Sequence, residues 1–193
     1  MKRFLNVGGN SKAIPVPPFY DGWEHVLLDI DASVAPDVVC DARELSTLPA
    51  GTYDSIYCSH NLEHYRRHEV PKVLAGFRHL LTADGFTLIR VPDVGAVMRI
   101  VAQHDLDVDS VLYQSPAGPI TVHDVLYGYG VEIESSGNDF FAHKCGFTRK
   151  LLRTVLRQAG FEHIYMAAAD LELSAFAFTR APSAASEKAL GIA

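Results

Sequence analysis

The segment from Tyr53 to Asp93 constrains the fold most, because it predicts a strand, a helix and a second strand in direct succession. Residues 55–59 contain no glycine or proline, as expected of a short buried strand. Apolar residues then recur at steps of three and four, which predicts a helix with one apolar face. These apolar residues are Val70, Val73, Leu74, Phe77, Leu80 and Leu81.

Asp84-Gly85 is expected to end this helix, and residues 86–91 to form the second strand, which Pro92 ends because it lacks a backbone donor. Two strands joined by a helix of this length are parallel neighbours with a right-handed crossover. In such sheets ligands bind beyond the carboxyl ends of the strands. Those ends are Ser59-His60 and Pro92-Asp93.

Further elements are expected on both sides of this unit. Strands are predicted over 4–7, 24–30 and 37–40, a closing hairpin over 162–167 and 173–179, and helices over 94–104 and 149–159. Thr148 and Gly160 have the residue types of a helix start and a helix end. Prolines at 15, 17 and 18 exclude a long helix after the first strand.

The segment 105–145 shows no periodicity and is rich in aromatic residues, which predicts a packed lid without regular structure. We therefore expect one domain over 1–180 that includes this lid, followed by a flexible tail over 181–193. The net charge of −6 argues against a nucleic-acid partner. Three isolated cysteines, no signal peptide and no membrane span predict a cytoplasmic protein.

Three strand ends carry candidate ligand groups. Gly8-Gly9-Asn10 follows the first strand and is either a ligand-binding loop or an ordinary tight turn. Asp29 ends the second strand about twenty residues later, a spacing typical of a carboxylate that accepts from ribose hydroxyls. A solvated loop acid is the alternative. Asp41 ends the third strand and is suited to an exocyclic amine such as that of adenine, or is a turn acid.

The stretch His60-Asn61-Leu62-Glu63-His64 satisfies the H-x-x-E-H pattern of inverted zinc proteases. That pattern needs a helix of its own and a third ligand on a later helix, and neither is evident in the sequence. A polar helix start with solvated histidines is the simpler interpretation. The third is the rim of a cofactor and substrate site.

Taken together, LNVGGN, VLLDID, DARELSTLP, YDSIYCSHNLEH and LLTADGFTLIRVPD resemble class I S-adenosylmethionine-dependent methyltransferases. The similarity is greatest to a small bacterial subgroup with an S-H-x-L-E-H signature, and it extends to about Thr179. It implies an α/β fold: a Rossmann-like, doubly wound, mostly parallel sheet with a C-terminal antiparallel hairpin strand and an aromatic-rich lid insertion. The first motif departs from the family pattern, since Asn6 replaces an acidic residue and Asn10 replaces a glycine.

The resemblance also implies a cofactor, S-adenosyl-L-methionine, and roles for individual residues. The loop Gly8, Gly9 and Asn10 would lie beside its methionine part, Asp29 at the ribose, Asp41 and Ala42 at the adenine, and Ser59 and His60 near the transferred methyl group. In some related O-methyltransferases the L-E-H segment helps to bind a divalent cation, which would make Glu63 and His64 ligands. His60 stands where those enzymes have a carboxylate, and we predict no metal site.

We therefore predict an enzyme that methylates a small-molecule or sugar-like acceptor, with oxygen as the accepting atom. A hydroxyl acceptor needs a base, and the candidates are His60 or His64, with His123 or His143 from the lid as rivals. Tyr127 is expected to line the acceptor pocket with His123 and His143. A non-catalytic, cofactor-binding or regulatory relative is the alternative function, and a zinc hydrolase is a distant third.

Overall fold

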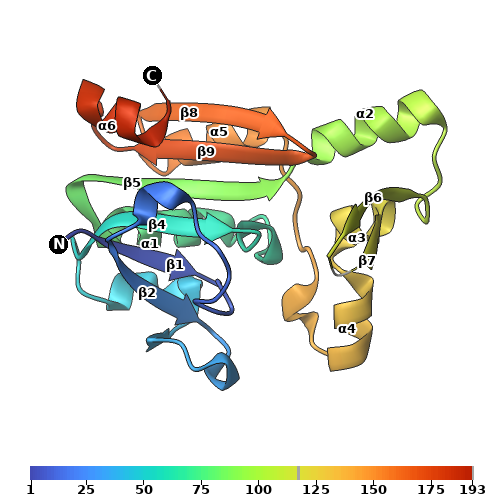
Figure 1. Cartoon of the computed structure of the whole chain (residues 1–193), viewed down its shortest axis with the longest axis horizontal. Helices are drawn as coiled ribbons and strands as arrows, with labels where there is room; N and C mark the ends of the chain where they lie inside the picture. Colours follow the sequence, from blue (N-terminus) through green and yellow to red (C-terminus); the bar gives the residue numbers. More distant parts are fainter. Residues whose placement is uncertain (117, 193) are drawn as a thin grey trace.

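The computed structural model describes residues 1–116 and 118–192, and it contains a seven-stranded sheet and a separate two-stranded sheet. The large sheet has the order β3-β2-β1-β4-β5-β9-β8 (Figure 1). Its strands are β1 (Arg3–Val7), β2 (Glu24–Asp29), β3 (Val38–Val39), β4 (Tyr53–Ser59), β5 (Leu81–Pro92), β8 (His163–Ala169) and β9 (Glu172–Phe178). All neighbours pair in parallel except β9 with β5 and with β8. The mostly parallel sheet with a closing antiparallel hairpin is confirmed.

The helices predicted by periodicity are also confirmed. They are α1 (Val70–Leu80), α2 (Val94–His104) and α5 (Arg149–Gln158). Thr148 caps α5 by accepting a hydrogen bond from the Leu151 amide, and Asp93 caps α2 in the same way from Ala96. In the part of the chain that the structure describes, no helix has the length and apolar content needed to cross a bilayer.

One face of the sheet is covered by α1, α5 and the short 3₁₀ helix η3 (Ala42–Thr47). The apolar stripe of α1 packs fully against β1, β4 and β5, with Phe77 and Leu80 both at 0% exposure. Burial of each such side chain stabilises the fold by about 1.5–3 kcal/mol. Gly76 allows α1 to approach η3, since a Cβ there would lie 2.7 Å from Leu45.

The opposite face is covered by a proline-rich segment rather than by a long helix. After β1 the chain forms only the 3₁₀ helix η1 (Pro18–Tyr20) before β2, as the prolines required. Tyr20 stacks on Phe4 with a centroid distance of 4.1 Å, and its buried hydroxyl shares a 2.8 Å hydrogen bond with Ser55. Elements thus cover both faces, which confirms the doubly wound α/β class.

The start of β5 differs from the expectation. The sequence placed the end of α1 at Asp84-Gly85, but α1 ends at Leu80 and β5 begins at the next residue. Tyr53 pairs with Leu81, whereas Ser55 pairs with Phe86, so β5 contributes extra residues at this irregular step. Asp84-Gly85 lies within this bulge, so residues typical of a turn are accommodated inside the strand.

The lid also differs, because it contains regular structure. A hairpin of β6 (Val111–Ser115) and β7 (Gly118–Thr121) is followed by α3 (Val122–Tyr127), α4 (Gly130–Ser136) and the 3₁₀ helix η5 (Asp139–Phe141). Figure 1 shows these elements grouped beyond the carboxyl end of β5, next to α2. They pack on a small core of their own, centred on Val97, Val122 and Val125.

The segment after Ala181, expected to be a flexible tail, contains α6 (Ala184–Leu190) as far as the structure describes it. Ser183 caps this helix, and Glu187 accepts a 2.7 Å hydrogen bond from the Tyr165 hydroxyl. Leu190 and Ile192 pack against the aromatic cluster on the second face of the sheet. Two apolar side chains at the end of a polar segment were too weak a signal to predict this helix.

Candidate functional site

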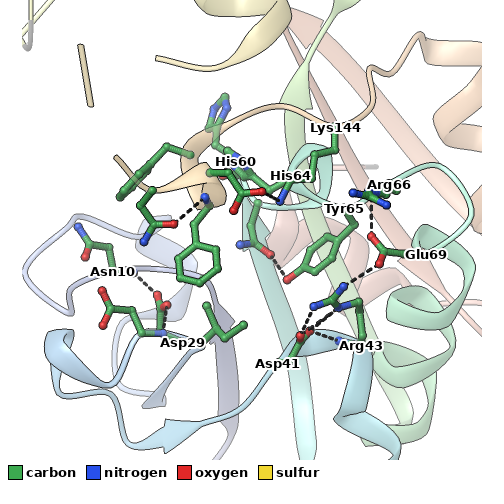
Figure 2. A pocket seen from close by; sticks show the side chains of 18 of the residues that line it. Asn10, Asp29, Asp41, Arg43, His60, His64, Tyr65, Arg66, Glu69 and Lys144 are labelled. Atoms are coloured by element: carbon green, nitrogen blue, oxygen red, sulfur yellow. Dashed lines mark hydrogen bonds and ion pairs between the residues drawn. The ribbon is translucent and has the colours of Figure 1, made fainter. Parts of the chain in front are cut away.

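A cavity of about 480 Å³ lies at the carboxyl ends of β1, β2, β3 and β4. Figure 2 shows the side chains that line it. They include residues from each of these strand ends and from the lid: Gly8, Asn10, Asp29, Asp41, Arg43, His60, Asn61, His64, Tyr65, Glu69, Phe140 and Lys144. This is the edge at which parallel sheets bind ligands.

The turn after β1 brings its backbone close to η4 (Leu62–His64), the 3₁₀ helix that follows β4. Gly8 has φ of +66°, and a Cβ there would lie 2.0 Å from Nδ2 of Asn61. Only glycine therefore fits at this position. The Tyr65 hydroxyl donates to Oδ1 of Asn61 at 3.1 Å and holds the amide in place.

Asp29 ends β2 and joins two loops of the cavity. One carboxylate oxygen accepts from the amide of Asn10 at 3.2 Å and the other from the amide of Asp31 at 3.1 Å. These bonds fix the carboxylate at the cavity wall, where each oxygen keeps further acceptor capacity. Asp29 therefore joins the loop after β2 to the turn after β1.

Asp41 is engaged by an ion pair that the sequence did not predict. Its carboxylate binds the guanidinium of Arg43, and it also accepts from the Arg43 amide at 2.9 Å. The hydrogen bond from the Arg43 side chain lowers the pKa of Asp41. Arg43 reaches further to Glu69 at 2.6 Å, which links β3 to the start of α1. A ligand amine at Asp41 would share the carboxylate with this guanidinium.

His60 lies at the end of β4 in a left-handed conformation, with φ of +48°. Its Nε2 is 2.8 Å from Glu172 of β9, and its Nδ1 is 3.5 Å from Glu63. Desolvation lowers the pKa of His60, but the bonds to Glu172 and Glu63 outweigh it and raise the pKa to about 9. Arg90 donates to Glu172 at 2.7 Å. His60 therefore connects β4 with β9 through a carboxylate.

A second cavity of about 670 Å³ lies between the lid and the loop before β9. Its wall is mainly aliphatic and aromatic, with a few polar groups, as in pockets for small organic ligands. The lining residues include Ile100, Leu112, Tyr113, Ile120, Val125, Tyr129, His143, Leu171 and Glu172. His60 lines both cavities, so the two meet at this residue.

The structure brings together most of the residues selected from the sequence. Gly8, Asn10, Asp29, Asp41, His60 and His64 line the first cavity, and His143 lines the second. Gly9, Ala42 and Ser59 lie next to lining residues without lining either cavity themselves. His123 and Tyr127 line neither: their rings stack at 4.9 Å on an exposed side of α3.

Several residues of the site escaped sequence analysis. Arg43 and Glu69 join it through ion pairs across a turn, and Glu172 is 112 residues from His60. No local pattern identifies such partners. Phe140, a residue of the lid, lines the first cavity. Asn61 could have been selected from the sequence, because it lies inside the H-x-x-E-H stretch next to the end of β4.

No family model and no curated protein matches this sequence. Solved structures do match. An S-adenosylmethionine-dependent methyltransferase from Archaeoglobus fulgidus has a TM-score of 0.54 at 16% identity, over 91% of this chain and 85% of that one. An N1-methyltransferase from Burkholderia thailandensis was crystallised with 1,6-didemethyltoxoflavin and S-adenosylhomocysteine. It has a TM-score of 0.51 at 19% identity, and the match covers 91% of this chain and 69% of that one.

An O-methyltransferase family protein from Burkholderia thailandensis has a TM-score of 0.56 at 10% identity, and the match covers 94% of this chain and 52% of that chain. The chain thus spans about half the length of this last protein. At such identities the likeness concerns the arrangement of strands and helices. This chain has the Rossmann-like fold of the S-adenosylmethionine-dependent methyltransferases.

Proposed function

We propose that this protein transfers a methyl group from S-adenosyl-L-methionine to a small-molecule acceptor, with oxygen as the accepting atom. One observation carries the proposal. The ends of four neighbouring strands line a single cavity of about 480 Å³ in a sheet of methyltransferase topology. A cavity of this size at this edge is suited to a nucleoside-containing cofactor.

In this proposal the turn of Gly8, Gly9 and Asn10 faces the methionine part of the cofactor. Asp29, held by two backbone amides, accepts from the ribose hydroxyls. Asp41 and Ala42 lie at the adenine, beside the Arg43 guanidinium. Lys144, near the end of the lid, also lines the cavity and supplies a positive group.

The acceptor occupies the second cavity and meets the methyl group near Ser59 and His60. A sulfonium methyl is already electrophilic, so alignment of the nucleophile and exclusion of water are the main tasks of the protein. Both ring nitrogens of His60 face carboxylates, so we assign this residue to positioning the acceptor. His64, which borders the first cavity, is the base that accepts a hydroxyl proton. His143 lines the acceptor side.

A second candidate is a relative that binds the cofactor without catalysis. The observation that favours it is the connection between β1 and β2, which contains only the short helix η1. A longer helix after β1 would direct the positive end of its dipole at the ligand, and this chain lacks that contribution. Asn10, at φ of +58°, completes the turn in place of a second glycine. This arrangement is expected to weaken cofactor binding more than it alters the fold.

Calorimetric titration with S-adenosylmethionine and S-adenosylhomocysteine tests the cofactor. We expect one molecule bound per chain, and at least tenfold weaker binding in Asp29→Asn. Asp84→Asn, an exposed carboxylate within β5 at the opposite edge of the sheet, is the matched control and should bind normally. If the unaltered chain binds neither compound, the proposal fails.

Transfer is then measured with radiolabelled cofactor and a panel of hydroxylated small molecules. Labelled product that depends on His60 supports the enzyme. Binding of S-adenosylhomocysteine without transfer to any member of a broad panel favours the non-catalytic relative instead.

A further inference from the structure

Glu63 is a buried carboxylate whose partner in the described chain is the His60 ring, with Nδ1 3.5 Å from Oε1. Its side chain is 1% exposed, and neither Oε1 nor Oε2 accepts a hydrogen bond from a described residue. Burial of an ionised carboxylate without donors costs several kcal/mol, so such groups are paired with a cation or bind a metal. Glu63 in η4 therefore has acceptor capacity left for a cation in addition to its 3.5 Å contact with His60.

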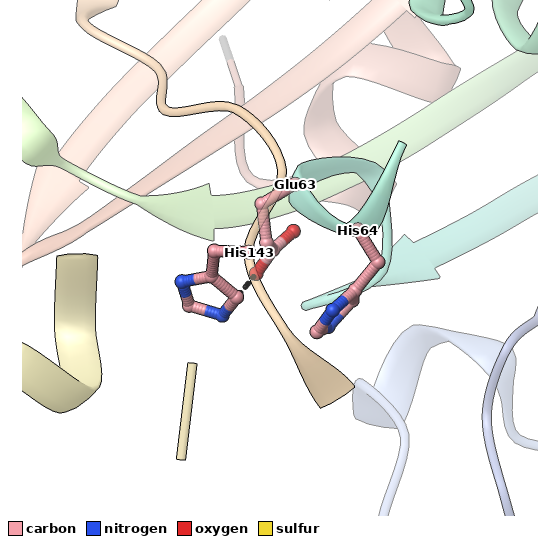
Figure 3. A group of neighbouring side chains, drawn as sticks. All are labelled: Glu63, His64 and His143. Atoms are coloured by element: carbon pink, nitrogen blue, oxygen red, sulfur yellow. Dashed lines mark ion pairs between the residues drawn. The ribbon is translucent and has the colours of Figure 1, made fainter. Parts of the chain in front are cut away.

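Two imidazoles lie on either side of this carboxylate, as Figure 3 shows. Ligand atoms of Glu63, His64 and His143 all lie within 4.8 Å of one another. Nε2 of His143 is 4.0 Å from Oε1 of Glu63, which is too long for a hydrogen bond. Two atoms that each bind one ion at about 2.1 Å are separated by roughly 3–4 Å, so small side-chain shifts would suffice to hold an ion.

The second ring nitrogen of each histidine is anchored to the backbone. Nδ1 of His64 is 3.1 Å from the carbonyl oxygen of Ala142, and Nδ1 of His143 is 3.0 Å from that of Val125. In the tautomer that donates these bonds, each Nε2 carries a lone pair. Histidines that bind metals are oriented in this way by a backbone or carboxylate acceptor.

Both nitrogens of the His64 ring face backbone carbonyls. Its Nε2 is 3.2 Å from the carbonyl oxygen of His60. A protonated ring donates to both carbonyls, whereas a ring that binds a metal donates through Nδ1 and turns the Nε2 lone pair from this carbonyl towards the ion. The left-handed backbone of His60 holds its carbonyl in this place.

We propose that Glu63, His64 and His143 bind a divalent transition-metal ion of the zinc type. Two imidazoles and one carboxylate are a ligand set of catalytic zinc sites, which keep a further position open. His64 lines the first cavity and His143 the second, so the ion lies at their boundary. Binding of the ion does not depend on methyl transfer.

The ion also refines the proposed function. With His64 as a ligand, the ion would make an acceptor hydroxyl bound at its open position more acidic. The ion then takes the place of the histidine base. This part of the inference rests on the proposed function, whereas the ion site itself does not.

The test uses the full chain with any affinity tag removed. Metal content is measured by mass spectrometry as purified, and the chelator-treated protein is titrated with Zn²⁺ and separately with Mg²⁺. We expect one Zn²⁺ per chain and no Mg²⁺ binding, because imidazole ligands suit zinc. Glu63→Gln and His143→Ala should each weaken Zn²⁺ binding at least tenfold. His123→Ala, a lid histidine outside the cluster, is the matched control and should bind normally.

Thermal stability gives a second readout. Zn²⁺ should raise the melting temperature of the parent and leave that of Glu63→Gln unchanged. Absence of stoichiometric Zn²⁺ binding, or equal binding by Glu63→Gln, overturns the inference. Titration of the metal-free protein with S-adenosylmethionine reports on the proposed function alone. A failure of the proposed function can therefore be distinguished from a failure of the proposed metal site.

Discussion

The side-chain amide of Asn61 lies so close to Gly8 that no other residue type fits in the turn after β1. The contact joins the first strand end to the fourth, across the cavity proposed for the cofactor. Tyr65 holds the amide from the other side. The shape of the turn is thus set by a side chain that follows β4, and cofactor binding is expected to depend on it.

Gly8→Ala should weaken binding of S-adenosylhomocysteine at least tenfold and lower the free energy of unfolding by about 1–2 kcal/mol. The alanine would have to adopt an unfavourable positive φ, and its Cβ would also clash with Asn61. Calorimetry and urea unfolding measure the two effects. Gly51→Ala is the control, since Gly51 has φ of +63° with open space around it. Asn61→Ala in the Gly8→Ala background should recover part of the stability. Equal losses in both glycine variants would show that the clash is unimportant.

Glu172→Gln should reduce methyl transfer at least tenfold while cofactor affinity changes less than about threefold. Glu172 lines only the second cavity, where it binds His60 and Arg90. Steady-state kinetics and calorimetry separate the two effects. Glu162→Gln, an exposed carboxylate just before β8, serves as the control. A large loss of cofactor affinity in Glu172→Gln would contradict the division into two cavities.

Asp124→Ala should loosen the lid without unfolding the sheet. The Asp124 carboxylate accepts from the amide and hydroxyl of Thr121 and from the amide of Gly130, which ties α3 to its neighbours. Loss of this cap costs about 1 kcal/mol locally. Hydrogen exchange should quicken over 118–130 and stay unchanged in β4 and β5. Unchanged exchange in the lid would refute this role.

Arg43→Met should destabilise the protein by about 1 kcal/mol at neutral pH and by less in acid. The Arg43 guanidinium lowers the pKa of Asp41, so the pair contributes its full stability above the unfolded pKa of about 3.9. That contribution is lost as the pH falls through the lower folded pKa. Urea unfolding from pH 7 to pH 3 measures the difference. Lys72→Met, which removes an exposed pair with Glu44, should have a smaller effect at every pH.

The strands and main helices could be predicted because their signals are local. The apolar stripe of Val70 to Leu80 specifies α1, and Thr148 and Gly160 mark the limits of α5. The shared location of Gly8, Asp29 and Asp41 could also be predicted, because parallel strands bring their carboxyl ends to one edge of the sheet. The lid was harder: its elements are short, although Thr121 and Asp124 form a capping box that the sequence does display.

The parts that escaped prediction depend on long-range contacts. Whether Glu63 is solvated or buried is decided by the packing of η4 against β5 and the segment that carries His143, and no local pattern reports this. The sequence analysis accordingly predicted no metal site. His123 and His143 both belong to the lid segment, yet His123 lies on the exposed side of α3 and His143 lies in a cavity wall.

The antiparallel insertion of β9 between β5 and β8 has a consequence for synthesis of the chain. Arg90 on β5 and Glu172 on β9 are 82 residues apart, so at 5–20 residues per second the ribosome needs about 4–16 s to supply the partner of β5. During that interval β5 is an unpaired edge, and Phe86 lacks its ring contacts with Phe176 and Phe178 of β9. Newly made chains are therefore most prone to aggregate, and most dependent on chaperones, before their last hairpin emerges.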